Sequence, residues 1–266
     1  MKSKEELKTL VKEVEAIAKI AGNYIRTERT HFNYSKVEIK GLNDLVSHVD
    51  KESERLIVKA LKALLPGSGF LVEENTSSEK GDYTWIVDPL DGTTNFVHGI
   101  PCYAVSIGLE YQGEIILGVV YEVSREECFS AMASGGAYLN GKPIKVSERQ
   151  SLSESLIATG FPIYNFEHLD NYLLVLKELM QCTQGLRRIG SAASDLCYLA
   201  CGRVDAFFEY NLNPWDVAAG ALIVKEAGGL VQDFKKGNTW LYGKQICAGN
   251  PMLFEEFSSL VNAHLG

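Results

Sequence analysis

The segment WIVDPLDGTTNF, from Trp85 to Phe96, holds the residues best suited to chemistry, because two carboxylates and two hydroxyls follow a short hydrophobic run. The proline after Asp88 fixes the backbone angle φ and Gly92 permits a tight turn, so Asp88 and Asp91 could converge on one point. Two carboxylates that lie close repel each other unless a cation lies between them. Mg²⁺ suits such a position, since it prefers hard oxygen ligands and leaves room for water and phosphate. The segment therefore predicts a magnesium site at the end of a strand.

Other structures could carry the same residues. The simplest alternative is an Asx-rich turn that only caps the segment after it. A calcium-binding EF-hand is disfavoured, because its alternating D-x-D-x-D-G register and its distal glutamate are absent. A phosphatase of the haloacid dehalogenase type carries its aspartates as D-x-D, which puts both on one face of a strand. Asp88 and Asp91 are separated by two residues instead, and this spacing disfavours that class.

Two further acidic segments strengthen the metal hypothesis. Glu73 and Glu74 follow the apolar run at residues 70–72, so they are expected at the end of another strand. Asp216, in the segment PWDVAAG, is expected at the start of a helix. Taken alone, the two glutamates could be a solvated pair in a loop, and Asp216 could merely cap its helix. Only the combination of the three segments is specific for a metal site.

Together the segments VEE, WIVDPLDGTTNF and WDVAAG resemble, in order and spacing, the motifs of the inositol monophosphatase family, and the resemblance extends over nearly the whole chain. It implies an α/β protein with a layered α-β-α-β-α sandwich. Residues 1–150 would form an α+β half with the metal and catalytic motifs, and residues 151–266 an α/β half that completes the site. The resemblance also implies a Mg²⁺-dependent, lithium-sensitive phosphatase of small molecules that forms a homodimer.

The resemblance further assigns roles to individual residues. Two or three Mg²⁺ ions per site would be held, with Asp88 as a bridge, by Glu73, Asp88, the Leu90 carbonyl, Asp91 and Asp216. The substrate would be bound by Leu90, Asp91, Gly92, Thr93, Gly190, Ser191, Ala192, Glu209 and Asp216. Of these, Glu209 and Asp216 would contact its hydroxyl groups. The catalytic residues would be Glu73, Asp50 and Thr93, of which the last two orient the attacking water and accept its proton.

Several nearby positions stay open at this stage. Val72 stands where relatives generally have glycine, which places a β-branched side chain beside the expected metal site. Arg187 and Arg188 could bind phosphate, pair with acids across a dimer interface or form a structural salt bridge. His98 lies near the motif but has no partner that the sequence reveals, so no catalytic role is assigned to it.

Hydrophobic periodicity predicts the elements that must position these residues. One amphipathic helix is expected over residues 4–28 and a second over residues 44–65. The buried residues of the second helix would be Leu56, Ile57, Ala60, Leu61 and Leu64. Short strands follow, and the Asn140-Gly141 pair predicts a tight hairpin. After about residue 150, strands and helices alternate until a closing helix that begins at Met252.

Composition and charge limit the partners. With 266 residues, of which 46% are hydrophobic, the chain can bury a large core. Its net charge of −8 provides no basic field for phosphate backbones, so neither nucleic acid nor a membrane is expected as the primary partner. The charged N-terminal segment and the lack of a long apolar run predict a cytoplasmic protein. The six cysteines are interpreted as core residues without disulfides or zinc.

The sequence thus predicts Mg²⁺-dependent hydrolysis of a small phosphate monoester by metal-activated water, without a covalent enzyme intermediate. The expected substrate is myo-inositol 1-phosphate, because Glu209, seven residues before Asp216, can accept hydrogen bonds from polyol hydroxyls. Histidinol phosphate and other sugar or nucleotide phosphates are alternatives within the family. A non-enzymatic regulatory binding protein on the same fold is an alternative of another class, although the complete carboxylate set argues against it.

Overall fold

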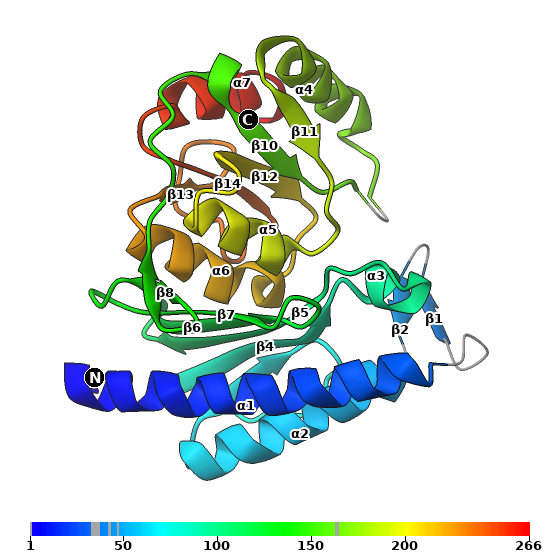
Figure 1. Cartoon of the computed structure of the whole chain (residues 1–266), viewed down its shortest axis with the longest axis vertical. Helices are drawn as coiled ribbons and strands as arrows, with labels where there is room; N and C mark the ends of the chain where they lie inside the picture. Colours follow the sequence, from blue (N-terminus) through cyan, green and yellow to red (C-terminus); the bar gives the residue numbers. More distant parts are fainter. Residues whose placement is uncertain (1, 33–37, 42–43, 47, 163–164) are drawn as a thin grey trace.

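The structure is a computed structural model that describes residues 2–32, 38–41, 44–46, 48–162 and 165–266. The elements of this part of the chain stack in five layers: two helices, a large sheet, two helices, a smaller sheet and two helices (Figure 1). The predicted fold class, an α/β protein with a layered α-β-α-β-α sandwich, is confirmed.

The first layer consists of α1 (Lys4–Thr30) and α2 (His48–Leu64), which lie side by side on one face of the large sheet (Figure 1). The predicted first helix is confirmed, and Ser3 and Glu6 cap its N-terminus in a reciprocal capping box. The predicted start of the second helix is wrong. Strand β2 (Asp44–Val46) pairs antiparallel with β1 (Glu38–Gly41), so its backbone groups bond to a strand and not to a helical turn.

The buried face of α2 also differs from the prediction. Leu56 is 37% exposed, whereas Asp50, Ser53 and Glu54 are almost fully buried. Ile57 and Leu61 are buried as predicted, and the other two predicted core residues are half-buried: Ala60 and Leu64. The face of α2 that meets the sheet therefore carries polar side chains in its first two turns.

The second layer is a seven-stranded sheet in the order β3-β4-β5-β6-β7-β8-β9. Its strands are β3 (Gly69–Val72), β4 (Tyr83–Asp91), β5 (Ala104–Tyr111), β6 (Glu114–Glu122), β7 (Glu127–Met132), β8 (Ala137–Leu139) and β9 (Lys142–Ile144). Neighbours pair antiparallel except β3 and β4, which are parallel. The predicted hairpin is confirmed, since Asn140 and Gly141 join β8 to β9 with positive φ angles of 48° and 75°.

The fourth layer is a five-stranded sheet in the order β11-β10-β12-β14-β13. Its strands are β10 (Leu156–Thr159), β11 (Gly185–Arg187), β12 (Ala206–Tyr210), β13 (Leu230–Gln232) and β14 (Gln245–Gly249). The sequence did not predict β14, which lies antiparallel between β12 and β13. A short 3₁₀ helix, η2 (Leu152–Glu154), precedes β10.

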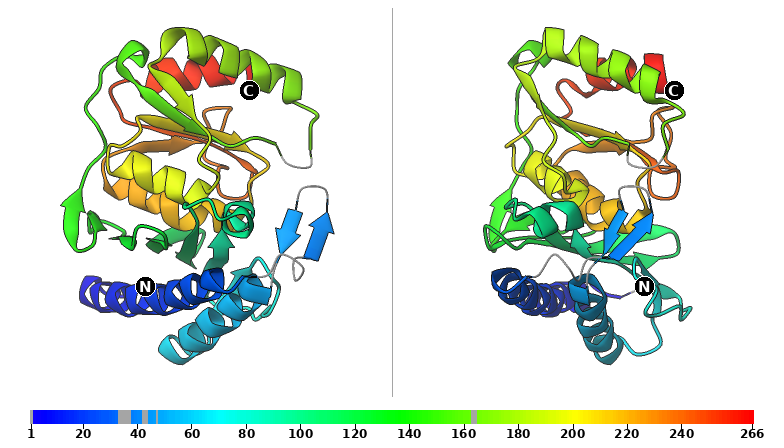
Figure 2. Two further views of the ribbon diagram at one scale, coloured as in Figure 1. Left: turned by 45° about the vertical axis from the view of Figure 1, so that its right-hand side comes forward. Right: turned by 90° about the vertical axis from the view of Figure 1, so that its right-hand side faces the viewer.

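Helices α5 (Ala192–Ala200) and α6 (Pro214–Glu226) lie between the two sheets, and α4 (Leu169–Cys182) and α7 (Phe254–Leu265) cover the outer face of the second sheet (Figure 2). Because α6 contacts other elements on all sides, almost its whole sequence is apolar. Gly118 of β6 lets α6 approach closely, since a Cβ atom there would lie 2.7 Å from the carbonyl oxygen of Ala219. This contact places the second turn of α6 beside the large sheet.

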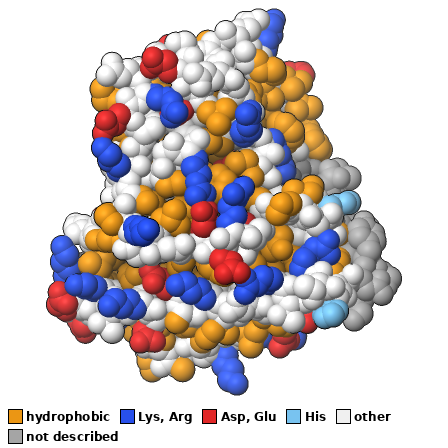
Figure 3. Space-filling model, in the orientation of Figure 1, with side chains coloured by type: hydrophobic (Ala, Val, Ile, Leu, Met, Phe, Trp, Pro, Cys, Tyr) orange, Lys and Arg blue, Asp and Glu red, His pale blue; other side chains and the backbone are white. Residues whose placement is uncertain are grey.

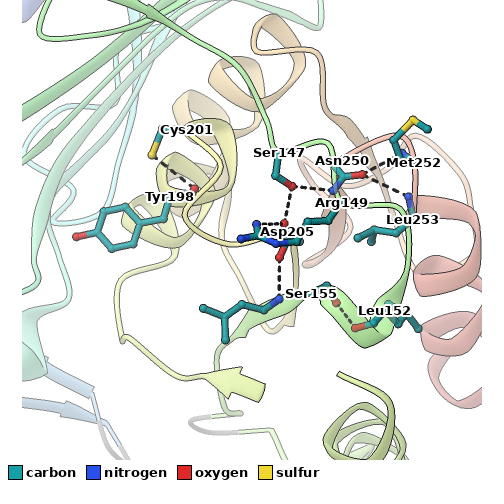
Figure 4. A network of polar contacts seen from close by, with 11 residues as sticks. Ser147, Arg149, Leu152, Ser155, Tyr198, Cys201, Asp205, Asn250, Met252 and Leu253 are labelled. Carbon is teal, nitrogen blue, oxygen red and sulfur yellow. Dashed lines mark hydrogen bonds and ion pairs between the residues drawn. The ribbon is translucent and has the colours of Figure 1, made fainter. Parts of the chain in front are cut away.

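The chain passes from the first sheet to the second through residues 145–155, and a buried carboxylate ties this passage to the second sheet (Figure 4). Asp205, fully buried, accepts hydrogen bonds from the Leu156 amide at 2.7 Å, from Arg149 at 2.9 Å and from the Ser147 hydroxyl at 2.5 Å. The Asn250 side chain also donates to Ser147, at 2.8 Å. Polar contacts therefore fix the connection together with Val146 and Leu152, which are buried in two of the apolar cores.

The surface agrees with the composition. Basic and acidic side chains are interspersed over the face shown in Figure 3 rather than gathered into one basic patch. Within the described residues, no helix is both long and apolar enough to span a membrane. All six cysteines are free; Cys182 and Cys201 are half-buried and the other four are buried.

Candidate active site

A cavity of about 290 Å³ lies where β4, the start of α5 and the start of α6 meet. The predicted metal-binding and substrate-binding residues all line it: Glu73, Asp88, Leu90, Asp91, Gly92, Thr93, Gly190, Ser191, Ala192, Glu209 and Asp216. Asp50 does not line the cavity but contacts Thr93, which does. The structure thus brings residues from six separate segments of the chain together.

An irregularity at the end of β4 brings its two aspartates to the cavity. Asp88 pairs with Ser106 and Asp91 with Ala104, so β4 has one more residue than β5 between the two pairs. This is a β-bulge, a device that redirects side chains at the end of a strand. The Leu90 amide donates to Asp88 Oδ1 at 2.9 Å inside the bulge. The predicted convergence of the two aspartates therefore has a backbone cause.

The N-termini of α5 and α6 hold Asp91 and Asp216 in place. Asp91 Oδ2 accepts hydrogen bonds from the hydroxyl of Ser191, the N-cap of α5, at 2.6 Å and from the amide of Ala193, in its first turn, at 2.7 Å. Asp216 lies in the first turn of α6 and accepts a 2.7 Å hydrogen bond from the Asn213 amide. Amide groups at helix N-termini stabilise carboxylates. The capping role considered for Asp216 is thus real, yet its side chain also lines the cavity.

Helix α2 supports the site from behind with three polar residues at spacing i, i+3 and i+4. The Thr93 hydroxyl lies 2.9 Å from Asp50 Oδ1 and 3.0 Å from the Leu90 carbonyl oxygen. Ser53 donates to the Pro89 carbonyl at 3.1 Å. The third residue, Glu54, fixes the loop after β3.

Glu54 is fully buried and binds two backbone amides, those of Glu74 at 2.6 Å and Thr76 at 2.8 Å. It therefore determines the path of the loop that begins with Glu73. Sequence reasoning missed Glu54 and Ser53. One signal in the sequence could have found them. Ser53 and Glu54 share a helix face with Ile57 and Leu61, which are apolar and buried.

The electrostatics of the cavity favour a cation or protons. Burial, then the charges of Glu73, Asp91 and Asp216, raise the pKa of Asp88 well above its usual range. Burial raises the pKa of Asp91 to about 6, although the Ser191 and Ala193 hydrogen bonds lower it. Burial, followed by the charge of Asp91, raises the pKa of Asp216 to about 7.

The donor set suits a hard divalent cation. Five carboxylates line the cavity. Four of them, those of Glu73, Asp88, Asp91 and Asp216, form with Leu90 the predicted set of oxygen ligands, the kind that Mg²⁺ prefers. The charge of Asp216 raises the pKa of Asp88, so the two carboxyl groups repel each other when both are ionised. A cation between them would relieve that repulsion. In the part of the chain that the structure describes, however, no three His, Cys, Asp or Glu side chains are already gathered closely enough to enclose a metal ion.

Two further charged residues line the cavity, one acidic and one basic. Glu209, at the end of β12, is 8% exposed, and burial raises its pKa to about 8 against the lowering effect of Arg188. The Arg188 guanidinium lies 5.7 Å from the ring centre of Phe161, which also lines the cavity. Sequence reasoning left Arg188 open and did not consider Phe161.

The remaining open positions lie away from the cavity wall. Arg187 is exposed and donates to the Leu186 carbonyl at 2.9 Å. His98 is exposed at the C-terminal end of α3 (Thr93–His98). Val72 is buried in the core beneath α1 and α2 and pairs regularly with Val87, so the strand accommodates its β-branched side chain.

Comparison with known proteins gives one family. A model of the inositol monophosphatase family matches residues 6–265. The chain is 43% identical to the putative Nus factor SuhB of Neisseria meningitidis, over 93% of this chain and 96% of that protein. It is 44% identical to the inositol-1-monophosphatase of Mesorhizobium japonicum, over 82% and 83%. The crystal structure of the extragenic suppressor protein SuhB from Bartonella henselae is similar with a TM-score of 0.90 and 40% identity, covering 95% of this chain and 98% of that one.

Proposed function

This chain belongs to the inositol monophosphatase family, and from that premise we propose that it is a Mg²⁺-dependent phosphatase of a small phosphate monoester, with myo-inositol 1-phosphate as the first candidate substrate. The observation that carries the proposal is the convergence of Glu73, Asp88, Asp91 and Asp216 on one cavity. These residues and the Leu90 carbonyl would hold two or three Mg²⁺ ions. Such a concentration of acids, of which Asp88 is buried and the other three are half-buried, is costly without a cation and is typical of a site built to bind one.

The bound ions would supply Lewis acidity toward the phosphate and a water of lowered pKa. The protein's part is to place and deprotonate that water. Thr93 lies between Asp50 and the Leu90 carbonyl, so its hydroxyl is held in a fixed orientation at the cavity wall. Asp50 is 1% exposed and can take a proton relayed through Thr93. Since water is the nucleophile, no covalent intermediate on the enzyme is needed.

The phosphate would lie against the wall formed by Gly92, Thr93, Gly190, Ser191 and Ala192. Two glycines allow the two backbone segments of this wall to meet. A Cβ atom at Gly92 would lie 3.0 Å from the Gly190 carbonyl oxygen, and both residues have positive φ angles. The alcohol part of the substrate would then extend toward Glu209 and Asp216, whose carboxylates can accept hydrogen bonds from hydroxyls. The ammonium group of histidinol phosphate would be attracted to the same acids.

A panel of phosphate monoesters tests the proposal. Purified protein is assayed for phosphate release from myo-inositol 1-phosphate, histidinol phosphate and adenosine 3′,5′-bisphosphate, in Mg²⁺ and in excess EDTA. We expect release from at least one compound, loss of release in EDTA and recovery when Mg²⁺ is added back. Full activity in EDTA would reject the metal-dependent mechanism, and no release from any compound would reject the enzymatic function.

A regulatory role is the second candidate, because several relatives are named Nus factors rather than phosphatases. A protein with that role alone would not need the complete set of acids. Absence of phosphate release together with unchanged thermal stability on addition of Mg²⁺ would favour it. Inhibition by Li⁺ and a homodimer are further expectations of the proposed enzyme, and inhibition assays and sedimentation check them.

A further inference from the structure

Tyr172 of helix α4 does not line the cavity, but it contacts the strand ends that carry two lining residues, Gly160 and Glu209. Its side chain is 1% exposed. Its hydroxyl lies 2.5 Å from the Thr159 hydroxyl and also donates to the Gly160 carbonyl. Thr159 in turn donates to the Phe208 carbonyl at 2.7 Å. One phenol therefore joins the ends of the parallel strands β10 and β12.

Those two strand ends carry residues that touch each other in the cavity. Glu209 follows Phe208, and Gly160 follows Thr159. A Cβ atom at Gly160 would lie 1.9 Å from the carboxyl carbon of Glu209, so the carboxylate lies directly on the glycine backbone. Both residues line the cavity. The position of the Glu209 carboxylate thus depends on where the backbone of Gly160 is held.

The ring of Tyr172 contacts the same segments. Its centre lies 5.4 Å from the ring centre of Phe208 and 5.6 Å from that of Tyr210, the two neighbours of Glu209 in β12. It also makes an edge contact with Phe161 at 6.4 Å. Packing and hydrogen bonding therefore fix the residues on both sides of Glu209 and of Gly160.

We propose that Tyr172 is a positioning residue that holds Gly160 against Glu209 and thereby sets the preference of the cavity for substrates whose alcohol part carries hydroxyl groups. This inference rests on the proposed phosphatase function. A carboxylate discriminates for hydroxyls only if it is held at hydrogen-bond distance from them, because a displaced acceptor loses most of the bond. The hydrogen bonds and ring contacts of Tyr172 given above all involve Gly160 or residues next to Gly160 and Glu209, so its effect should be confined to the alcohol part.

Tyr172→Phe tests the inference, because it keeps the ring and removes the hydroxyl. We expect KM for myo-inositol 1-phosphate to rise about three- to tenfold, the effect of a weakened hydrogen bond. The kinetic constants for p-nitrophenyl phosphate, whose leaving group has no hydroxyls, and the Mg²⁺ dependence should stay within about twofold. Gly160→Ala places a methyl group against the Glu209 carboxylate and should displace it. It should raise KM for myo-inositol 1-phosphate, relative to KM for p-nitrophenyl phosphate, more than Tyr172→Phe does. Tyr121→Phe, which alters a buried tyrosine in the core beneath α1, is the matched control.

A second measurement does not depend on turnover. Amide hydrogen exchange at Gly160 and Glu209 should be faster in Tyr172→Phe than in wild type and in Tyr121→Phe, after correction for global stability. Equal proportional losses on both substrates would overturn the inference, and so would unchanged exchange at the two strand ends. If wild-type protein hydrolyses no phosphate ester, the proposed function fails, and unchanged or faster exchange still decides whether Tyr172 holds the two residues together.

Discussion

Asp88 lines the acidic cavity. It is 2% exposed, and the charges of three other carboxylates, those of Glu73, Asp91 and Asp216, add to burial in raising its pKa. Its Oδ1 atom accepts the Leu90 amide, an interaction that an asparagine side chain could preserve. Charge at this position is therefore costly to the metal-free protein and is retained for another reason, which we propose to be metal binding.

Asp88→Asn should consequently abolish turnover and stabilise the metal-free protein. Loss of a carboxylate that would hold Mg²⁺ should lower kcat/KM by orders of magnitude, while relief of repulsion should raise the free energy of unfolding in EDTA by ~0.5 to 2 kcal/mol. Saturating Mg²⁺ should stabilise wild type more than the variant. Thermal melts in EDTA and in Mg²⁺ measure both effects on stability, with exposed Asp82→Asn as control. A variant that melts below wild type in EDTA would show that repulsion among the carboxylates does not limit the stability of the metal-free protein.

Glu54 gives a second prediction at the residue scale. Glu54→Gln can satisfy only one of the two amides that Glu54 binds, so the loop that carries Glu73 should loosen. We expect a loss of about 1 to 3 kcal/mol in stability and a higher Mg²⁺ concentration at half-maximal activity. Glu52→Gln, on the exposed side of the same helix, removes only a surface pair with Arg55 and serves as control. Equal effects of the two variants would contradict the assigned role.

The elements of the site are positioned by contacts at their ends. The bulge at the end of β4 aims two aspartates, and the first turns of α5 and α6 each bind one aspartate. Asn95 of α3 adds a direct tie, since its side chain donates to the Ile189 carbonyl at 2.9 Å and to the Cys102 carbonyl at 2.8 Å. Strand and helix ends leave backbone groups unpaired, so they can bind side chains that the interior of an element cannot.

Away from the cavity, the hydrogen bonds that Asp205 accepts hold the start of β10 and the segment before it in place (Figure 4). Asp205→Ala would leave the Leu156 amide and the Ser147 hydroxyl without their buried acceptor, which should cost about 2 to 4 kcal/mol. Arg149 is 46% exposed, so Arg149→Ala should cost less than about 1 kcal/mol. Urea denaturation of both variants compares the two losses. If Arg149→Ala were as costly as Asp205→Ala, the ion pair rather than the buried hydrogen bonds would be the main contribution.

At the scale of the whole molecule, the layer formed by α5 and α6 belongs to both sheets. One apolar core contains Ile86 and Val120 of the large sheet together with Phe207 and Ile246 of the smaller one. Separation of these helices from either sheet would expose apolar surface both on that sheet and on the helices. We therefore propose that the halves 1–150 and 151–266 are parts of one cooperative unit.

Cooperative unfolding is the prediction at this scale. Native-state hydrogen exchange should give similar opening free energies for the central strands β6 and β12, and chemical denaturation should show one transition by circular dichroism and by tryptophan fluorescence. Gly118→Val, which would force α6 away from β6, should lower the stability of both sheets together. Two separated transitions, or destabilisation of β6 alone, would show that the halves fold independently.

The sequence by itself determined the features that depend on neighbours along the chain. Apolar periodicity identified α1, the Asn140-Gly141 pair identified the hairpin, and the spacing of Asp88 and Asp91 indicated two carboxylates on one point. These signals are local, because helical and strand periods and turn conformations are set within a few residues. The family resemblance extended them to the candidate set of site residues and to the layered fold.

Only the tertiary structure decided which distant residues support that set. Glu54 binds amides about 20 residues away, and Tyr172 contacts Gly160, on which the Glu209 carboxylate lies. Strand β2 replaced the expected first turn of α2, because its pairing with β1 satisfies its backbone groups. A local pattern states how apolar or polar a position is, but not which partner will satisfy a buried polar group. That partner is chosen when all the layers pack, since a buried carboxylate or hydroxyl is stable only where the fold brings it a donor or an acceptor.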